Sequence, residues 1–380
     1  MAANRVNRKV MGRLRLASQG LLGPGLGSVE NAVRWMTATQ AQDLQAALWA
    51  IGVRVPGAGL ADVRAALHSG SVVRSWPMRG TLHFVAPDDL RWMLDLTTER
   101  LSRIIAGRHR ELDITPADIE KCRDVALERI AAGGPVSRTE LFEVFEAAGQ
   151  PTTGQRGIHI LGTLCRHGWL VQGPLAGNQQ LLVAFDDWIP VSRDLEQQEA
   201  IAEFMLRYFR SHGPATVRDF AWWTQIPLTD VRAAFELVSG QLVELEFGGA
   251  SYWMSPETAS MLDDGVPGQR SVLLVPGFDE FVLGYMDRSL VLAPEHANKI
   301  VPGGNGVFKK TVVAGGAVIG TWGRAGTTRS AAVVPELFDE TTPLGAGAQA
   351  AFSKAAEQYL AFLDSNAGSL SVHPRVRNGP

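Results

Sequence analysis

Apolar positions recur with helical spacing through most of the first 256 residues, and short strand-like runs separate the helical stretches. From about residue 256 the pattern changes to strands, among them "SVLLVPGF" (271–278) and "GVFKKTVVAGGAVIGTWGR" (306–324). An amphipathic helix follows at about 347–363. The pattern predicts an α+β protein that ends in a β-rich, mixed α/β domain.

Three helical stretches end in the same way. Each stops at a glycine and turns into an apolar strand: "LHSGSVVRSW" (67–76), "CRHGWLVQGP" (165–174) and "LVSGQLVELE" (237–246). A glycine at the end of a helix readily adopts the left-handed conformation that caps it. Gly70, Gly168 and Gly240 are therefore predicted to be C-terminal caps.

The second and third of these repeats also share their middle part. A Gly-Pro sequence breaks the chain in both "GGPVSRTELFEVF" (133–145) and "HGPATVRDFAWWT" (212–224). Ser137 and Thr216 come directly before the next helical stretch, and hydroxyl side chains favour that position. We therefore predict that both residues are N-caps.

Each repeat closes with a predicted β-hairpin. Turn sequences stand at 177–178 and 248–249, and "SVVRSWPMRGTLHFV" (71–85) has the same place in the first repeat. Helices followed by a hairpin form the winged-helix plan. The sequence predicts three tandem winged helices, because three copies with aligned glycine stops are more specific than one.

The module boundaries follow from these patterns. We predict N-terminal helices with the first winged helix at 1–110, the second winged helix at 111–190 and the third at 191–256. The C-terminal domain follows at 257–365, and a disordered tail at 366–380. In the C-terminal domain, "KKTVVAGGAVIGTW" (309–322) is predicted to be a hairpin that turns at Gly315-Gly316. Lys309, Lys310 and Arg324 then lie near its base or faces.

Charge is uneven along a chain whose formal net charge is only −3. Residues 1–110 hold 15 Lys and Arg against 7 Asp and Glu, whereas the remainder holds 21 against 32. A polyanion is therefore expected to meet the N-terminal part. Neither a membrane span nor a signal peptide is indicated, so we expect a cytoplasmic protein.

No cofactor or metal site is indicated. Cys122 and Cys165 stand in helical patterns without a CxxC sequence, and we interpret both as core residues. The eight histidines form neither an HExxH motif nor a Cys/His cluster. "PGGNGVFKKT" (302–311) contains glycines and lysines, but a strand follows it where a phosphate-binding loop needs a helix.

One short polar motif precedes a predicted buried helix. In "TATQAQDLQAALWA" (37–50), Gln40 and Gln42 are two residues apart, so in an extended segment both amides point the same way. Asp43 is the predicted N-cap of the helix, and the pair is expected to face outward at its start. The alternative is two solvated loop glutamines.

Two further segments carry candidate chemistry. "MRGTLHF" (78–84) places Arg79, Thr81 and His83 on one face of a strand, with a half-exposed wing strand as the alternative. "PGFDEFVLGYMDR" (276–288) contains three carboxylates, for which we favour capping and salt-bridge roles over catalysis. The ten tryptophans fit core packing better than base stacking.

The segments "TQAQDLQAALWAIGVR", "VVRSWPMRGTLHFV", "PGFDEFVLGYMDR" and "GVFKKTVVAGGAVIGTWGR", in this order, resemble the AlkZ-like (YcaQ-like) family of bacterial winged-helix DNA glycosylases. The resemblance spans nearly the whole chain. It implies a C-shaped arrangement around DNA and excision of N7-alkylguanine and related purines, with interstrand crosslinks as further substrates. The family's catalytic signature is Gln-apolar-Gln, which Gln40-Ala41-Gln42 matches.

The resemblance leads to specific expectations. Gln40 and Gln42 position a water molecule for monofunctional hydrolysis, without a cofactor. Double-stranded DNA with alkylated bases is the partner of a monomer in the cytoplasm, associated with the nucleoid. The residues expected to contact DNA are Arg74, Arg79, His83, Lys309, Lys310 and Arg324. The alternative is a winged-helix DNA-binding protein or transcription regulator without catalytic activity, although Glu244 and Glu246 in the third wing would repel phosphate.

Overall fold

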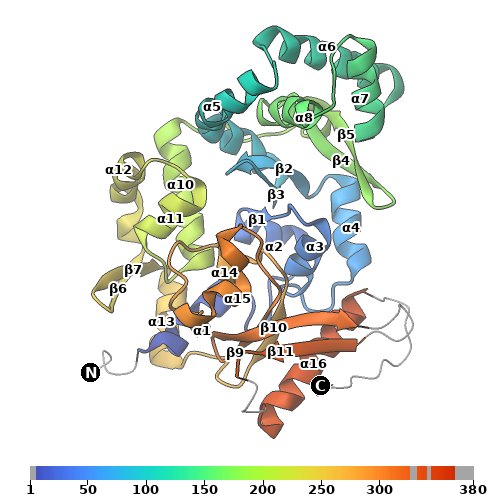
Figure 1. Ribbon diagram of the computed structural model, residues 1–380. Helices are drawn as coiled ribbons and strands as arrows, with labels where there is room; N and C mark the ends of the chain where they lie inside the picture. Colours follow the sequence, from blue (N-terminus) through green and yellow to red (C-terminus); the bar gives the residue numbers. More distant parts are fainter. Residues whose placement is uncertain (1–5, 326–331, 340–343, 364–380) are drawn as a thin grey trace. The chain divides into compact units, whose positions relative to one another are not determined.

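The computed structural model describes residues 6–325, 332–339 and 344–363 (Figure 1). Its internal contacts divide the chain into two compact units. Unit 1 comprises Met1–Val63, Ala202–Trp223 and Pro227–Pro380, and unit 2 comprises Arg64–Ile201 with Thr224–Ile226. The predicted boundaries at 110, 190 and 256 remain a prediction, and the predicted disordered tail at 366–380 lies outside the described residues.

Unit 2 contains two hairpins and the helices between and around them. Its elements are α4 (Leu60–Ser69, from Arg64 onward), β2 (Val73–Met78), β3 (Thr81–Val85), α5 (Pro87–Glu111), α6 (Pro116–Gly133), α7 (Arg138–Ala147), α8 (Arg156–Arg166), β4 (Leu170–Ala176), β5 (Gln179–Ala184) and α9 (Phe185–Trp188). Within this unit the antiparallel strand order is β3-β2-β4-β5. The two hairpins join where Arg74 of β2 pairs with Gln172 of β4.

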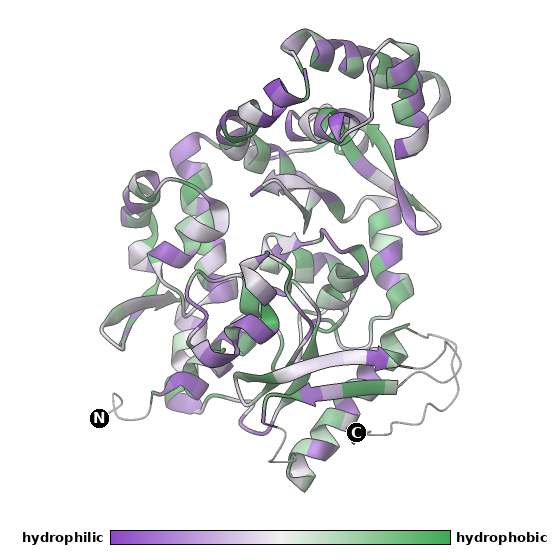
Figure 2. Cartoon of the chain, in the orientation of Figure 1, coloured by the Kyte–Doolittle hydropathy of each residue, from purple (hydrophilic) through white to green (hydrophobic). Residues whose placement is uncertain are grey.

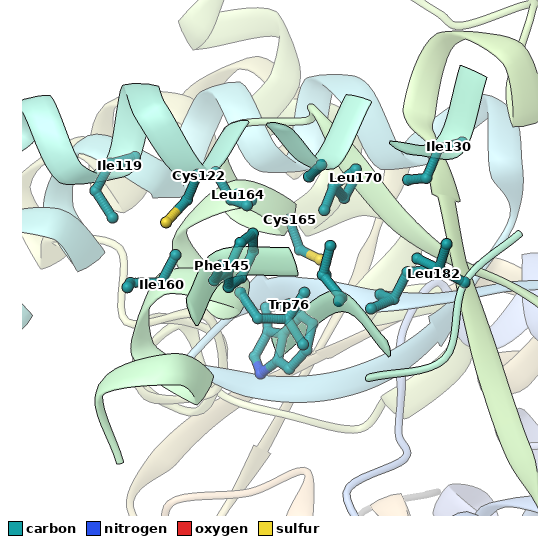
Figure 3. Close-up of a cluster of buried hydrophobic side chains, with 14 of the residues drawn as sticks. Trp76, Ile119, Cys122, Ile130, Phe145, Ile160, Leu164, Cys165, Leu170 and Leu182 are labelled. Atoms are coloured by element: carbon teal, nitrogen blue, oxygen red, sulfur yellow. The ribbon is translucent and has the colours of Figure 1, made fainter. Parts of the chain in front are cut away.

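The core of unit 2 lies between its helices and this sheet (Figure 3). Trp76 of β2, Phe145 of α7 and Leu182 of β5 belong to it, together with Cys122 and Cys165. Burial raises the pKa of the Cys122 thiol to about 11 and that of the Cys165 thiol to about 12. The prediction that both cysteines are core residues is confirmed.

Unit 1 combines N-terminal helices, a helical segment from the middle of the chain and the C-terminal domain. Its elements are α1 (Arg8–Ser18), α2 (Val29–Met36), β1 (Thr39–Gln40), α3 (Leu44–Gly52), α10 (Gln197–His212, from Ala202 onward), α11 (Val217–Thr224, up to Trp223), α12 (Leu228–Val238), η2 (Ser239–Gln241), β6 (Val243–Phe247), β7 (Ala250–Met254), α13 (Pro256–Asp264), β8 (Val272–Val275), α14 (Glu280–Leu283), η3 (Pro294–His296), α15 (Ala297–Ile300), η4 (Pro302–Gly304), β9 (Thr311–Ala314), β10 (Ala317–Ala325), β11 (Ala332–Leu337) and α16 (Ala346–Leu363). Strands β11-β10-β9-β8 form an antiparallel sheet, and β6 and β7 form a separate hairpin.

Two tryptophans fasten helix α16 to the C-terminal sheet. The Trp49 indole N–H donates to the Leu274 carbonyl at 2.8 Å, and the Trp322 indole N–H donates to the Val275 carbonyl at 2.9 Å. Both rings contact Tyr359 of α16, with centroids 5.2 and 4.7 Å away. Helix α3, which carries Trp49, is thereby tied to the β-rich part of unit 1.

The two predicted N-caps of the repeats are confirmed. The Ser137 hydroxyl accepts from the Glu140 N–H, while the Glu140 carboxylate accepts from the Ser137 N–H. Thr216 and Asp219 exchange the same two hydrogen bonds, at 3.0 and 2.9 Å. In each repeat the residue after Gly-Pro also bridges to the hairpin, Val136 to Leu182 and Ala215 to Trp253. These shared contacts support the repeat, while assignment of each copy as a winged helix remains a prediction.

The predicted hairpin turns are present, and one predicted helix cap is wrong. Gly177 and Gly248 have positive φ in their turns, as Gly70 (φ 80°) and Gly168 (φ 66°) have at the ends of their helices. Gly240 does not, because α12 runs into the 3-10 turn η2 instead of stopping at a left-handed residue. The β4–β5 hairpin is hydrophobic at its base, and β5 is hydrophilic where it leaves the turn at Gln179 and Gln180 (Figure 2).

Five of the ten tryptophans are buried, as core packing predicts. Trp92 and Trp223 are among the largest fully buried side chains. Trp35 is an exception, because it is 41% exposed, although its indole N–H donates to the Ser18 carbonyl at 2.6 Å. Core packing therefore explains Trp92 and Trp223 but does not explain Trp35.

Candidate active site

The chain enters the Gln-Ala-Gln motif through a strained turn. Helix α2 ends at Met36, and the Ala38 N–H donates to the Met36 carbonyl at 2.7 Å, which closes a γ-turn around Thr37. Thr37 has φ 66° and ψ −53°, the rarer, positive-φ form of this turn. Such a backbone costs on the order of 1–3 kcal/mol and persists only where the surrounding structure holds it.

The two glutamines of the motif have different surroundings. Gln40 ends strand β1 and is only 8% exposed, whereas Gln42 is exposed in the bend that follows. The prediction that both amides face outward is therefore wrong for Gln40. Strand β1 also ends at Gln40, and the chain bends at Gln42, so the alternation of side chains along one strand does not reach Gln42.

Asp43 caps helix α3 as predicted. Its Oδ1 accepts from the Ala46 N–H at 3.1 Å, and its own backbone is extended. Helix α3 is buried from Ala46 onward. Gln42 thus lies at the exposed start of a buried helix, where the direction of the chain is fixed by the cap.

A buried carboxylate from a distant part of the chain holds the backbone of Gln40. The Gln40 N–H donates to Glu280 Oε1 at 3.0 Å, across 240 positions of sequence. Glu280 is the first residue of α14 and is fully buried. Its second oxygen, Oε2, accepts from the Trp223 indole N–H at 2.9 Å.

Asp279, the residue before Glu280, anchors the same helix. Its Oδ1 accepts from the Phe281 N–H at 2.9 Å, which caps α14, and its carboxylate pairs with Arg54 at 2.8 and 3.0 Å. Asp287 accepts from the Ser289 N–H at 2.8 Å. Capping and salt-bridge roles are thereby confirmed for Asp279, whereas the Asp287 carboxylate bonds a nearby backbone N–H in a loop.

Aromatic side chains surround the Glu280 carboxylate. The His212 ring stacks on Tyr208 with centroids 4.7 Å apart, and its Nε2 lies 3.7 Å from Glu280 Oε2. Burial lowers the pKa of His212 from its ordinary value of 6.5, an effect that the neighbouring Glu280 carboxylate opposes. Burial favours the neutral form of His212 beside the carboxylate.

The predicted basic hairpin exists, but its turn is covered. Strands β9 and β10 turn at Gly315-Gly316, and the Gly316 carbonyl occupies the space that a side chain on Gly12 of α1 would need. The basic residues lie at the other end of the pair. Lys309 is exposed, and the Lys310 ammonium lies 4.9 Å from the centre of the Trp322 ring.

Arg324 extends the same end of the sheet. It is exposed on β10, three positions beyond Thr321, which pairs with Thr311 of β9. Because Lys310 directly precedes Thr311, antiparallel pairing brings Lys309, Lys310 and Arg324 to one end of the two strands. The structure therefore gathers these three predicted DNA contacts in unit 1.

The predicted DNA contacts of unit 2 are part of its sheet. Arg74 is 9% exposed, and its Nη1 lies 3.1 Å from Gln172 Oε1 and 3.2 Å from Gln180 Oε1. Arg79 lies in the β2–β3 turn with φ 56°, which corrects its predicted place on a strand. His83 is fully buried, with Nε2 3.0 Å from Arg79 Nη2, so the half-exposed strand is wrong at His83. Contact of these residues with DNA remains a prediction.

Two kinds of feature are not found among the described residues. No group of three or more His, Cys, Asp or Glu side chains is placed to hold a metal ion. None of the described helices combines the length and the apolar character needed to cross a membrane.

Three residues of this site were not anticipated in their roles. The γ-turn at Thr37 has no sequence signal, because a threonine is unfavourable there. An arginine such as Arg54 often pairs with a carboxylate, but the amino-acid sequence does not identify which carboxylate. Glu280 is one of the three carboxylates of residues 276–288, but its bond to the Gln40 backbone depends on folding that joins distant segments.

Comparison with known proteins relates the chain to DNA glycosylases. A model of the family described as "DNA glycosylase AlkZ-like" matches residues 33–362. The chain is 25% identical over 312 residues to an "Interstrand DNA cross-link repair glycosylase" of Streptomyces sahachiroi, covering 78% of this chain and 82% of that protein. The solved structure of "Streptomyces sahachiroi DNA glycosylase AlkZ" aligns with a TM-score of 0.80 at 24% identity, covering 97% of this chain and 99% of that one. The structural match confirms the predicted α+β class.

Proposed function

Because the chain belongs to the AlkZ-like DNA glycosylase family, we propose that it excises cationic alkylated purines, N7-alkylguanine above all, with Gln40 and Gln42 positioning the attacking water. The observation that carries this proposal is the Gln-Ala-Gln motif at 40–42, inside the matched residues and directly before the Asp43 cap. The motif joins a buried, backbone-anchored glutamine to an exposed one.

The chemistry of the substrate explains why amides suffice. An N7-alkylated guanine is a cation, so its C1′–N9 bond is already weakened. As that bond breaks, its electron pair goes to N9 and leaves the base neutral. No general acid is needed to protonate the leaving group.

The glutamines then act on the water rather than on the base. A glutamine carbonyl accepts a hydrogen bond from the water, and an amide N–H donates one. The water oxygen bonds to C1′, and its surplus proton passes to solvent, because an amide does not take up a proton at neutral pH. The gain comes from holding the water in place. The product is an abasic site with both strands intact.

Larger lesions extend this proposal. The Streptomyces sahachiroi relative is named for interstrand cross-link repair, and we include bulky N7 adducts and crosslinks among the substrates of this chain. Lys309, Lys310 and Arg324 are proposed to contact DNA phosphates, since they gather at one end of β9 and β10. The protein is proposed to act as a monomer on double-stranded DNA.

The experiment measures free base released from a duplex that carries one 7-methylguanine. Under single-turnover conditions, Gln40→Ala and Gln42→Ala are each expected to lower the rate constant by at least about 100-fold, the scale of a lost positioning contact. DNA affinity is expected to change little, because neither side chain is proposed to bind phosphate.

Gln45→Ala is the matched control. Gln45 is an exposed glutamine in the first turn of α3, three positions beyond Gln42 but outside the motif. It should leave the rate constant unchanged. Wild-type excision by the Gln40→Ala/Gln42→Ala double variant would remove the motif from the mechanism. Binding without any base release by the wild-type protein would favour a DNA-binding regulator instead.

A further inference from the structure

We propose that Glu280 is a positioning residue for excision, because its carboxylate fixes the backbone from which the Gln40 side chain extends. This inference rests on the proposed role of Gln40. Glu280 does not enter the reaction itself. It acts through the hydrogen bond from the Gln40 N–H to Oε1, 3.0 Å long.

The buried surroundings of Glu280 strengthen this hydrogen bond, and they make burial of the carboxylate unfavourable in free energy. The residue is fully buried, and burying a carboxylate in a protein interior is unfavourable unless donors satisfy it. The adjacent cation, Arg54, pairs with Asp279. Glu280 instead accepts from two neutral N–H groups, Gln40 and Trp223, as charge-assisted hydrogen bonds. A buried charge that is directed at the motif is more easily explained by positioning than by stability.

Both segments that meet at this bond are held rigidly. Phe278, which precedes Asp279 and Glu280, has φ 62°, and Thr37, which precedes the motif, has φ 66°. Strained backbone of this kind requires the neighbouring structure to fix it. The Arg54–Asp279 pair fixes the segment after Phe278, and the hydrogen bond from the Ala38 N–H to the Met36 carbonyl closes the turn at Thr37. The Gln40 backbone is thereby held at a defined position, which a water-positioning amide requires.

The second partner of Glu280 provides a test that separates positioning from folding. In Glu280→Gln, only one of the two terminal atoms can accept, so either the Gln40 N–H or the Trp223 indole N–H faces an amide NH₂. Trp223→Phe removes the indole donor without touching Gln40. In the double variant, the new glutamine can direct its oxygen to the Gln40 N–H, and its NH₂ takes the place of Oε2, where the indole donor has been removed and His212 Nε2 lies 3.7 Å away.

The measurement is the single-turnover rate constant for 7-methylguanine release, with DNA affinity and unfolding measured on the same proteins. Glu280→Gln is expected to lower the rate constant at least about tenfold with unchanged DNA affinity, because a displaced Gln40 misplaces the water. Trp223→Phe should stay within about twofold of the wild type, and Trp223→Phe/Glu280→Gln should recover to within about threefold of Trp223→Phe. A merely structural role predicts accumulated loss in the double variant.

Wild-type rates in Glu280→Gln, or no recovery in the double variant, would overturn the inference. If Glu280→Gln does not fold, the comparison moves to the Trp223→Phe background, with Glu280→Gln against Glu280→Met. These two side chains are similar in volume, but only the glutamine has an oxygen that can accept from the Gln40 N–H. Equal rates in that pair overturn the inference, and a slower Glu280→Met supports it.

Gln40→Ala is measured in parallel, so that the two proposals can fail separately. If Gln40→Ala excises as the wild type does, the proposed function of the motif fails whatever Glu280 does. If Gln40→Ala is inactive while Glu280→Gln is as fast as the wild type, only the positioning role of Glu280 fails.

Discussion

Arg54 and Asp279 form a buried two-point ion pair, with Nη1 to Oδ2 at 2.8 Å and Nη2 to Oδ1 at 3.0 Å. The same guanidinium donates to the Ala50 carbonyl at 2.8 Å and to the Gln19 side-chain oxygen at 2.8 Å. One side chain thus joins the ends of α1 and α3 to the start of α14. The pair fixes the helix that carries Glu280.

Asp279→Asn is expected to destabilise the protein by about 3–5 kcal/mol, because it leaves the Arg54 charge buried without its counter-ion. The free energy of unfolding from denaturant titration measures this loss. Asp287→Asn is the control, since Asp287 is exposed and should change stability by only about 0.5 kcal/mol. A loss below about 1 kcal/mol in Asp279→Asn would show that the pair contributes little.

Because the two motif glutamines differ in burial, their alanine variants should differ in the free energy of unfolding although both lose excision activity. Gln42→Ala should change the free energy of unfolding by no more than about 0.5 kcal/mol, because Gln42 is exposed. Gln40→Ala should cost about 1–3 kcal/mol, because it removes a side chain that is only 8% exposed from its packed surroundings. Both variants should lose excision. Equal stability of the two would contradict the burial of Gln40.

Features governed by neighbouring residues were predictable from the sequence. Asp43 and Ser137 cap their helices because their side chains reach the N–H groups three positions further on. The turn at Gly315-Gly316 follows from glycine's tolerance of positive φ. The burial of Cys122 in the core follows from its place in an apolar helical pattern. In each case the deciding interaction lies within a few residues.

Features governed by distant contacts were not predictable. Gln40 is polar and precedes a helix, so the local pattern placed it in solvent, but it is buried and its backbone N–H bonds Glu280. His83 alternates as a half-exposed strand residue does, yet it is fully buried. Gly240 failed as a cap because α12 continues into a 3-10 turn, a choice that the glycine alone does not determine.

His212 should make stability depend on pH. Its folded-state pKa lies below the ordinary 6.5, so the unfolded chain binds the proton more readily. The stabilisation is therefore fully present above pH 6.5 and is lost as pH falls from there toward the folded-state pKa. The charged groups that act on the ring are Glu280, Arg54 and Asp279.

His212→Phe tests this dependence. Phenylalanine retains an aromatic ring against Tyr208 but cannot take up a proton. Below pH 6.5, the slope of unfolding free energy against pH should decrease by up to about 1.4 kcal/mol per pH unit, the value for one proton. Denaturant titrations at several pH values measure the slope. A slope equal to that of the wild type would show that His212 does not titrate differently in the folded state.

The basic end of the β9–β10 pair should govern the salt dependence of binding. If about five phosphates are neutralised in the complex, log Kd should change with log salt by about 4–5 per decade, following about 0.9 per phosphate. Lys309→Ala/Lys310→Ala should reduce this slope by about 2 and weaken binding equally across sequences. Fluorescence anisotropy at several salt concentrations measures both quantities.

Lys354→Ala is the control for this prediction, because Lys354 is an exposed lysine on α16 outside the proposed contact set. It should leave the slope unchanged. Equal slopes for the wild type and the Lys309/Lys310 double variant would show that the basic end does not meet phosphate.

The charge of the leaving base should decide which lesions are excised. A water positioned by amides is a weak nucleophile, so only bases that depart readily, such as cationic N7-alkylguanine or N3-alkyladenine, should be released. Uracil and hypoxanthine are neutral and need protonation or a stronger base, which Gln40 and Gln42 cannot supply. The measurement is a time course of free base from duplexes carrying 7-methylguanine, a bulky N7 adduct, uracil or hypoxanthine.

The bulky N7 adduct separates this explanation from selection by a tight pocket. An enzyme that reads a flipped base in a closely fitting pocket rejects bulk at N7 and accepts a small neutral lesion of suitable shape. An enzyme that relies on the charge of the base releases both N7 lesions and neither neutral base, since bulk at N7 leaves the C1′–N9 bond equally weakened. Efficient release of uracil or hypoxanthine, or retention of 7-methylguanine, would therefore show that Gln40 and Gln42 do not work by positioning water beneath a departing cation.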